Sequence, residues 1–392
     1  MLIALYSLTC LTLAAILLPL PLCSSFLYLT SRLFSNKRKI RRISRFRLLK
    51  HLVSILIFAP IVLLLGPIDF LLTVIYRCIK PYQPPVFICG TPRSGSTLLH
   101  RLLIQSSDEL YGYTHLEWRF PSVTFQLLLS LTGFKKRLSQ RNYWPESEIQ
   151  NTVSKMHPNV MGDFEEDAIL FEERIAHHPY QNLHSPESTT LNYFSLFSHE
   201  PTSFFSLRSR LMRIYKFCIY SLSILKYPSS TFVSKEVAAN EKLWHLKDQF
   251  PKSKFIVITR HPDSYLSSLK PLLQLSTISK TGDDTFINST TWWGSWYSWL
   301  VRQAQEVTHF YKKNSAEINP RVLHVSFESL VRKPHDEMKR IFNFLELPLT
   351  SKFMETIDNF QARQSSRARG YEYEFIDYSK EDFSEFLRVF YT

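Results

Sequence analysis

The sequence lacks the cysteine patterns of a zinc site or a disulfide framework. Its five cysteines include no C-x-x-C pair, and three of them lie in or beside apolar segments. From residue 86 onward there is also no internal repeat and no low-complexity tract. These absences exclude a small cysteine-stabilised fold and a repeat array, and they leave a chain long enough to bury a sizeable core. The cysteines are Cys10, Cys23, Cys78, Cys89 and Cys218.

Acidic residues are scarce at one end of the chain only. Residues 1–80 hold eleven Lys and Arg but a single acid, Asp69, which amounts to a net charge of +10. The whole chain carries +13, so the residues after 80 carry only 13 − 10 = +3. Proteins that bind nucleic acid concentrate positive charge on a folded face. The near balance after residue 80 therefore predicts no nucleic-acid partner.

Charge of either sign is missing from the first 31 residues, which are apolar and long enough to span a bilayer. A cleaved signal peptide is the alternative, but Pro19, Pro21 and the absence of basic residues at the start disfavour it. Residues 32–50 then hold nine cations and no acid, a composition suited to anionic lipid headgroups. Residues 52–76 form a second, interrupted apolar stretch that could span, re-enter or lie in the interface.

We expect residues 1–80 to be a membrane-anchor region with one or two hydrophobic helices, and we favour two spans. If both segments cross, the basic loop 32–50 is cytoplasmic and the following domain faces a lumen or the exterior. If only the first crosses, that domain is cytoplasmic. The Asn288-Ser289-Thr290 sequon is compatible with a lumenal domain. Membrane lipid is the expected partner of residues 1–80.

A folded domain is expected from residue 86 to residue 392. A short linker rich in proline precedes it, at Pro81, Pro84 and Pro85. After this linker, apolar strand-like runs alternate with helical patterns and loops. That alternation predicts an α/β fold with a mainly parallel sheet.

The stretch 86–103, VFICGTPRSGSTLLHRLL, predicts a buried strand, a tight turn and a helix. The turn combines Gly90 and Gly95 with small hydroxyl residues and one cation, Arg93. Backbone N–H groups of such a turn and of the helix start converge on one spot, where a phosphate or sulfate is stabilised. The glycine spacing is that of a P-loop, but Ser96 stands where the P-loop lysine would be.

The TPRSGSTLLHRLL segment resembles the 5′-phosphosulfate loop of the sulfotransferase superfamily, in the branch with PRSG[ST]T-type loops. Members of that superfamily use 3′-phosphoadenosine-5′-phosphosulfate (PAPS). The resemblance implies a P-loop-like, three-layer α/β/α domain. It also implies that the loop binds the donor and stabilises the leaving group, with Arg93 serving both purposes. The loop residues so implied are Arg93, Ser94, Gly95, Ser96 and Thr97.

A second stretch, 232–272, extends the resemblance. The segment FVSKE places Lys235 at the end of a short strand, and FIVIT predicts a buried strand that ends before Arg260. In the superfamily, an arginine after this strand and a serine eight residues later bind the 3′-phosphate of PAPS, and Arg260 and Ser268 have that spacing. Guanidinium and hydroxyl groups suit phosphate oxygens. Lys235 is implied as a further cation at the transferred group.

The proton acceptor is expected in the segment 111–119, YGYTHLEWR, which is interpreted as an extended strand returning to the sheet. His115 and Glu117 are two residues apart and would then share one face. The resemblance implies a carboxylate base here, so Glu117 is the first choice and His115 the second. Late in the chain, Arg367 and Arg369 are candidates for a basic loop over the 3′-phosphate.

The implied reaction moves a sulfuryl group from PAPS to a hydroxyl or amine of a carbohydrate, lipid or small molecule, without a metal. In a eukaryotic cell the family favours the lumen of the Golgi or another endomembrane. One alternative is a P-loop kinase or NTPase, which would need the missing lysine and an acid after FIVIT. Another is a membrane-anchored binding module of the same fold without activity. The segment around Phe327 and Glu328 is expected to be structural.

Overall fold

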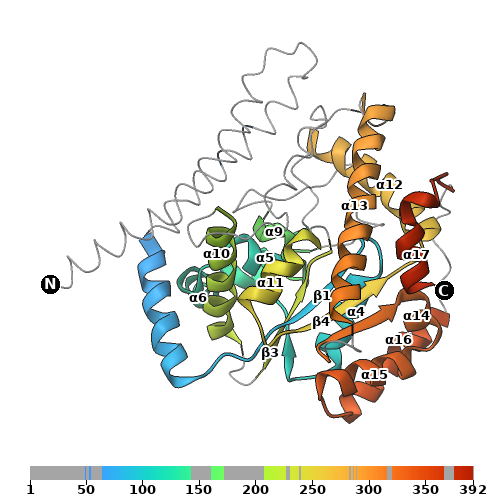
Figure 1. Cartoon of the computed structure of the whole chain (residues 1–392). Helices are drawn as coiled ribbons and strands as arrows, with labels where there is room; N and C mark the ends of the chain where they lie inside the picture. Colours follow the sequence, from blue (N-terminus) through green and yellow to red (C-terminus); the bar gives the residue numbers. More distant parts are fainter. Residues whose placement is uncertain are drawn as a thin grey trace. The chain divides into compact units, whose positions relative to one another are not determined.

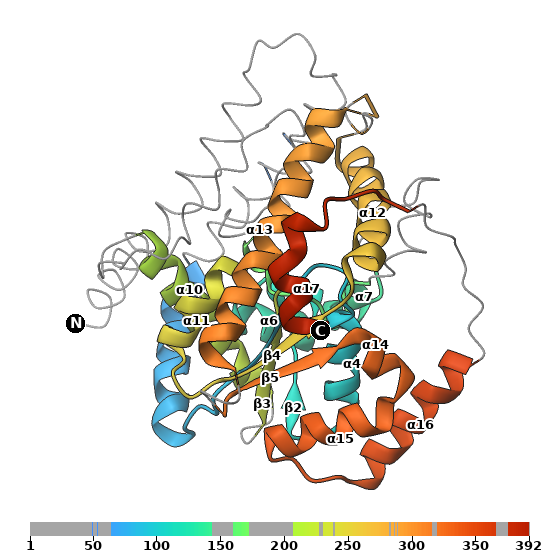
Figure 2. The same cartoon turned by 45° about the vertical axis from the view of Figure 1, so that its right-hand side comes forward.

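A computed structural model gives the fold of the chain (Figures 1 and 2). The apolar segment 1–31, predicted to cross a membrane, lies outside the residues that the structure describes. The described ranges are 64–142, 160–171, 207–226, 230–237, 240–281, 290–315, 320–365 and 375–391, with the single residues 49, 53, 284, 285, 287 and 289.

The chain divides into two compact units, each assembled from separate stretches of sequence. Unit 1 comprises Met1–Tyr82, Tyr113–Pro228 and Leu272–Ser295. Unit 2 comprises Gln83–Gly112, Ser229–Pro271 and Trp296–Thr392. The division into an anchor over 1–80 and a transferase domain over 86–392 stays a prediction.

Unit 2 contains a five-stranded sheet in the order β2-β3-β1-β4-β5, and every neighbouring pair is parallel. Apolar, β-branched and aromatic residues dominate its central strands, which suits strands covered on both faces. In β1, Ile88 lies opposite Lys235 of β3 and Ile256 of β4. The strands are β1 (Val86–Gly90), β2 (Leu110–Tyr111), β3 (Thr231–Lys235), β4 (Lys254–Thr259) and β5 (Val322–Ser326).

Helices cover both faces of the sheet. Alternate residues of each strand point to opposite faces, so Ile88 and Ile256 join a core with Leu99 and Ile341 on one side. That side is covered by α4 (Ser96–Ser106), α14 (Phe327–Arg332), α15 (Pro334–Leu345) and α16 (Ser351–Ser365).

On the other face, the ring of Phe255 in β4 lies 5.3 Å from that of Phe87 and 5.2 Å from that of Phe310, centroid to centroid. Phe310 belongs to α13 (Thr290–Asn314), and α11 (Leu243–Gln249) packs beside it through Trp244. The two covered faces confirm the predicted three-layer α/β arrangement. The remaining helices of unit 2 are η6 (Asn240–Lys242), η7 (Glu381–Phe383), α17 (Ser384–Phe390) and the first half of α12 (Pro262–Thr281).

The longer regular elements that the structure describes in unit 1 are helices, joined by turns and two isolated β-bridges, and aromatic rings form part of its core. The ring of Trp118 lies 5.0 Å from that of Tyr113 and 6.2 Å from that of Tyr215, which in turn lies 5.2 Å from Phe171. Its elements are a helix over 64–79, α5 (His115–Arg119), α6 (Val123–Leu131), α7 (Phe134–Ser139), α9 (Ala168–Leu170), α10 (Leu207–Leu222) and η5 (Ser223–Leu225).

The prediction of a strand over 111–119 is wrong beyond Tyr111. Residues from His115 to Arg119 form the helix α5, which begins with a capping box. The Thr114 hydroxyl accepts a hydrogen bond from the Glu117 N–H, and the Glu117 carboxylate accepts one from the Thr114 N–H. This reciprocal pair satisfies two backbone donors and fixes a helix start. His115 and Glu117 therefore do not share the face of a strand.

None of the helices within the described ranges combines the length and the apolar character that a membrane crossing requires.

Candidate active site

The turn between β1 and α4 contains three residues with positive φ values. Gly90 and Gly95 adopt φ values of 151° and 87°, and Arg93 between them has φ 65°. A Cβ atom at Gly90 would collide with the carbonyl oxygen of Ile258, and one at Gly95 with the ring of Phe327. The two glycines are therefore needed both for conformation and for space. The left-handed Arg93 is a local strain of the kind found where a side chain must be aimed.

The turn has the properties of an anion site. Helix α4 begins at Ser96, and its N-cap Gly95 supplies no side-chain cap, so the N–H groups of its first turn face outward from the helix end. The Ser94 N–H donates to the Thr91 carbonyl at 3.2 Å, which closes the turn. The Ser94 and Thr91 hydroxyls are fully buried, and neither has a hydrogen-bond partner among the described residues.

Those two hydroxyl groups bear on whether a phosphosulfate fits. A buried polar group without a partner costs about 1–3 kcal/mol. An anionic oxygen bound in the turn would give each hydroxyl an acceptor and would meet the helix dipole as well. The residues of the turn therefore fit the phosphosulfate end of PAPS.

Lys235 brings a cation to this turn from the neighbouring strand. The parallel register sets it beside Ile88, one strand over from the end of β1. Its Nζ donates to the Thr97 hydroxyl at 2.9 Å, and the side chain is buried. A buried ammonium group has lost its hydration, so an anion nearby stabilises it.

The turn after β4 meets the turn after β1. Arg93 Nε donates to Ser268 Oγ at 3.0 Å, and Arg260 Nη1 donates to the Arg93 carbonyl oxygen at 3.3 Å. Because β1 and β4 are neighbours and parallel, their carboxyl ends lie at the same edge of the sheet, where ligands of open α/β sheets bind. The structure thus brings together eight of the predicted site residues within unit 2: Arg93, Ser94, Gly95, Ser96, Thr97, Lys235, Arg260 and Ser268.

The Arg260 turn is held by residues that sequence reasoning assigned to structure alone. The Arg260 guanidinium lies 4.7 Å from the centroid of the Phe327 ring. Glu328 accepts a hydrogen bond from the His261 N–H at 3.1 Å and one from the Ser326 hydroxyl at 2.9 Å. Tyr391 lies near the same carboxylate, with its hydroxyl 3.4 Å from Glu328 Oε2. Phe327 therefore contacts the phosphate-binding candidate Arg260 directly, and Glu328 bonds the backbone of the next residue, His261.

A buried polar network that the sequence analysis missed supports the first turn from behind. Asn240 Nδ2 donates to the Gly90 carbonyl at 2.9 Å, and the Asn240 N–H donates to Gln303 Oε1 at 2.8 Å. Gln303 Nε2 in turn donates to Glu241 at 2.9 Å. Burial raises the pKa of the Glu241 carboxyl to about 7. The network ties the end of β1 to α13 and fixes where the turn begins.

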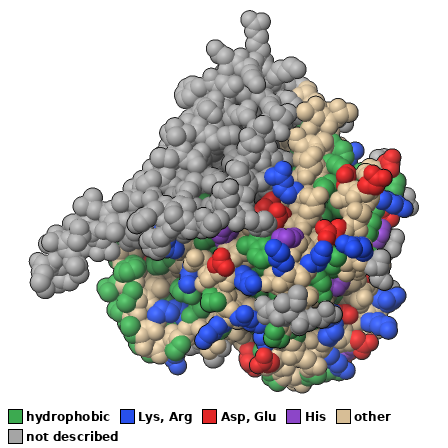
Figure 3. Space-filling view, viewed as in Figure 1, with side chains coloured by type: hydrophobic (Ala, Val, Ile, Leu, Met, Phe, Trp, Pro, Cys, Tyr) green, Lys and Arg blue, Asp and Glu red, His purple; other side chains and the backbone are tan. Residues whose placement is uncertain are grey.

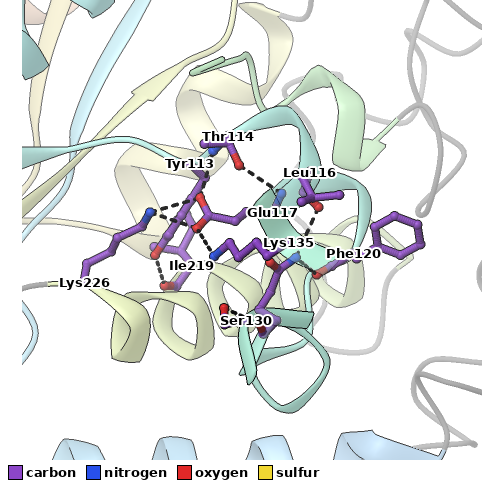
Figure 4. A network of polar contacts seen from close by, with 10 residues as sticks. Tyr113, Thr114, Leu116, Glu117, Phe120, Ser130, Lys135, Ile219 and Lys226 are labelled. Atoms are coloured by element: carbon purple, nitrogen blue, oxygen red, sulfur yellow. Dashed lines mark hydrogen bonds and ion pairs between the residues drawn. The ribbon is translucent and has the colours of Figure 1, made fainter. Parts of the chain in front are cut away.

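The candidate bases belong to unit 1. Both side chains are buried, and the His115 N–H donates to the Asp163 carbonyl at 2.9 Å. Glu117 forms ion pairs with Lys226 at 2.9 Å and Lys135 at 3.3 Å (Figure 4). Burial favours the neutral acid, but the two lysines and the Thr114 N–H outweigh it and lower the pKa of Glu117. The carboxylate is thus ionised at neutral pH.

Two predicted residues, Arg367 and Arg369, lie outside the described residues. Within the described ranges, no three His, Cys, Asp or Glu side chains gather as a metal site would require.

Comparisons with known proteins agree with this geometry. Residues 84–351 match the model of the sulfotransferase family. A search of curated protein sequences finds no match.

Two solved structures resemble the fold over most of the chain. Sulfotransferase STF9 from Mycobacterium avium superposes with a TM-score of 0.62 and 16% identity, over 91% of this chain and 88% of that one. Sulfotransferase STF1 from Mycobacterium tuberculosis H37Rv gives a TM-score of 0.55 and 12% identity, over 92% and 90%. At these identities the likeness establishes a shared α/β fold.

Proposed function

Because this chain belongs to the sulfotransferase family as a PAPS-dependent transferase, we propose that it transfers the sulfuryl group to a hydroxyl or amine of a carbohydrate, lipid or small-molecule acceptor. The observation that carries the proposal is the direct link from the turn after β1 to the turn and helix after β4: Arg93 bonds Ser268 of α12, and Arg260 bonds the Arg93 carbonyl. It allows one nucleotide to be held at both of its anionic ends by a continuous set of donors.

At the 5′ end, Arg93, Lys235 and the first-turn N–H groups of α4 hold the phosphosulfate. Their role in the reaction is to stabilise charge that grows on the bridging oxygen as the sulfur–oxygen bond breaks. They are fixed before reaction by the strained turn and by the Lys235–Thr97 hydrogen bond. Donors that need no reorganisation stabilise a transition state more than mobile ones do.

At the 3′ end, Arg260 and Ser268 hold the 3′-phosphate. A guanidinium can offer two parallel N–H groups to phosphate oxygens. Phe327 lies against the guanidinium of Arg260, and Glu328 bonds the backbone of the same turn, so both act as positioning residues. Arg367 and Arg369 are proposed to add positive charge here.

During transfer, the acceptor oxygen or nitrogen forms a bond to sulfur while the bond from sulfur to the 5′-phosphate oxygen breaks. The leaving phosphate keeps the electron pair, and the proton of the acceptor passes to a base. We assign that role to Glu117, whose carboxylate is ionised at neutral pH, with His115 as the second candidate. A lowered pKa makes the carboxylate a weaker base, so its proton affinity must rise when the acceptor is bound.

Transfer of labelled sulfur from PAPS to a panel of glycans, lipids and small molecules tests the proposal. We expect label in one acceptor class, and loss of that label in an Arg93→Ala variant that still folds. Binding of ATP only with Mg²⁺, together with no binding of PAPS, would instead support a kinase or NTPase. Binding of PAPS without transfer to any acceptor would support the non-catalytic module.

We also propose that residues 1–80 anchor the protein in a Golgi or other endomembrane, with the catalytic domain in the lumen. The uncharged first 31 residues and the nine cations of residues 32–50 support this. Glycosylation of Asn288, detected as a mass shift removed by an endoglycosidase, is the expected result. Cleavage of the domain by protease added to sealed vesicles with their cytoplasmic face outward would place it in the cytoplasm.

A further inference from the structure

Unit 1 exposes an apolar stripe on the helix formed by residues 64–79. A helix on the surface of a soluble protein normally presents polar side chains to water. Here the outward residues recur at helical spacing and are apolar, and Ile79 is 68% exposed. Figure 3 shows green hydrophobic side chains gathered at the lower left, over this helix. The exposed residues are Leu64, Ile68, Phe70, Leu71, Val74, Ile75 and Ile79.

A second exposed apolar surface lies on α6 and the start of α7. Leu131, at the end of α6, is 85% exposed, and Phe134, which begins α7, is also exposed. Leu127 and Leu128 are exposed one turn earlier. Leaving such large side chains in water forfeits about 1.5–3 kcal/mol for each, which indicates that something covers them.

The two surfaces are fixed to each other. Asp69 Oδ1, on the buried side of the first helix, accepts hydrogen bonds from the Thr124 N–H at 2.8 Å and the Thr124 hydroxyl at 2.6 Å. Thr124 lies in the first turn of α6, so the aspartate anchors the start of that helix. We name the exposed apolar residues of 64–79 together with Leu127, Leu128, Leu131 and Phe134 the apolar surface.

Positive charge accompanies the apolar surface. Lys136 and Arg137 lie two and three residues after Phe134, Arg141 comes four residues after Arg137, and all three are exposed. Within 64–82 and 122–142 the one acid is Asp69, which is buried and bonded to Thr124. A helix that lies in a membrane interface has exposed apolar side chains with cations beside them, and these segments have that composition and no exposed acid.

We propose that the apolar surface of unit 1 docks onto a phospholipid bilayer, with Leu131 and Phe134 entering the headgroup–acyl boundary and Lys136, Arg137 and Arg141 contacting anionic headgroups. A second copy of the chain is a less suitable partner for the apolar surface. In a two-fold contact each surface meets itself, so the cations of α7 would face like charges. This proposal does not depend on the transfer reaction, and it adds α6 and α7 to the lipid contacts expected of residues 1–80.

A photoreactive amino acid at position 131 tests the proposal in the full-length protein, reconstituted into vesicles of phosphatidylcholine and phosphatidylserine that include an alkyne-labelled lipid. We expect a lipid adduct on illumination. The matched control is the same amino acid at Leu349, which is 45% exposed in unit 2 and should give several-fold less adduct. Leu131 makes too little contact with the protein for its replacement to disturb folding.

Each other result overturns the proposal. An adduct of twice the protein mass would show that a second copy covers the surface, and an adduct to another protein would show a protein partner. Equal lipid adduct at positions 131 and 349 would show no specific docking.

The charge component has a separate test. In the Lys136→Gln/Arg137→Gln variant, the lipid adduct at 131 should fall by about fivefold per removed charge in anionic vesicles at low salt. It should not change in vesicles of phosphatidylcholine alone. An unchanged yield in both would refute the headgroup contacts.

Discussion

Arg93 and Ser268 are 175 residues apart in the sequence and are joined by a hydrogen bond of 3.0 Å from Nε to Oγ. The bond links the turn after β1 to helix α12, which follows the neighbouring strand β4. The guanidinium proposed to bind the phosphosulfate is therefore held by a serine proposed to bind the 3′-phosphate. If Ser268 moves when it binds the 3′-phosphate, the position of the Arg93 guanidinium changes with it.

Replacing Arg93 by alanine should reduce kcat by about 10²–10³-fold, the usual effect of losing one preorganised donor to developing negative charge. The melting temperature should change little, because the side chain is only partly buried. The matched control is Arg332→Ala, at an exposed position in the last turn of α14, which should keep full activity. Full activity of the Arg93→Ala variant would remove the basis for the assigned role.

Replacing Ser268 by alanine should raise the KM for PAPS by about 10- to 100-fold with a smaller change in kcat, since a hydrogen bond to a charged group contributes about 1.5–3 kcal/mol. Ser267 is the matched control, because its hydroxyl donates to the Asp263 carbonyl within the same helix, at 2.8 Å. The Ser267→Ala variant should bind PAPS normally. Equal KM values in the two variants would contradict a phosphate-binding role for Ser268.

Replacing Gln303 by leucine should lower the free energy of unfolding by about 1–3 kcal/mol, because the buried Asn240 N–H then loses its acceptor. PAPS binding should weaken as well, since Asn240 also holds the Gly90 carbonyl. Chemical denaturation and PAPS titration measure the two effects. Gln105→Leu, at an exposed position of α4, is the control and should leave both unchanged.

The stability contributed by Glu117 should depend on pH. Because the folded protein lowers the pKa of this carboxyl, its contribution is present above the pKa of the unfolded chain and is lost as pH falls through the folded value. The melting-temperature difference between wild type and Glu117→Gln should thus be largest near neutral pH and shrink below about pH 4.3. Thermal melts from pH 7 to pH 3 measure it.

The same variant separates the two roles of Glu117. If it is the base, kcat of Glu117→Gln should fall far more than that of Lys226→Met, although both variants break the same ion pair. Equal losses of kcat that follow the losses of stability would show that the carboxylate only holds the two lysines.

The local sequence was sufficient to predict those parts of the site that directly follow a strand. An apolar run of β-branched and aromatic residues fixes β1 and β4, and glycines or a proline fix the turns after them. The prediction of a strand over 111–119 was wrong because it applied the two-residue alternation of a strand to His115 and Glu117. The T-x-x-E pattern from Thr114 to Glu117 carried the opposite signal, since it is the signature of a capped helix start.

Contacts between distant segments could not be predicted in the same way. Gln303 lies between the buried residues Leu300, Ala304 and Val307 of α13, so a polar residue on an apolar stripe was a signal that something would pair with it. The sequence does not say that the partner is Asn240. The contact of Glu328 with the turn after β4 was harder still to predict, because it depends on β5 lying beside β4.

The Phe327 ring has a consequence for how this site can change over time. It fills the space where a side chain at Gly95 would stand, and its face lies against the Arg260 guanidinium. A smaller residue at 327 would deprive the arginine of its support, and position 95 would still require glycine because its φ is 87°. The glycine therefore cannot change even if the ring does, and an exchange at 327 has its cost at Arg260.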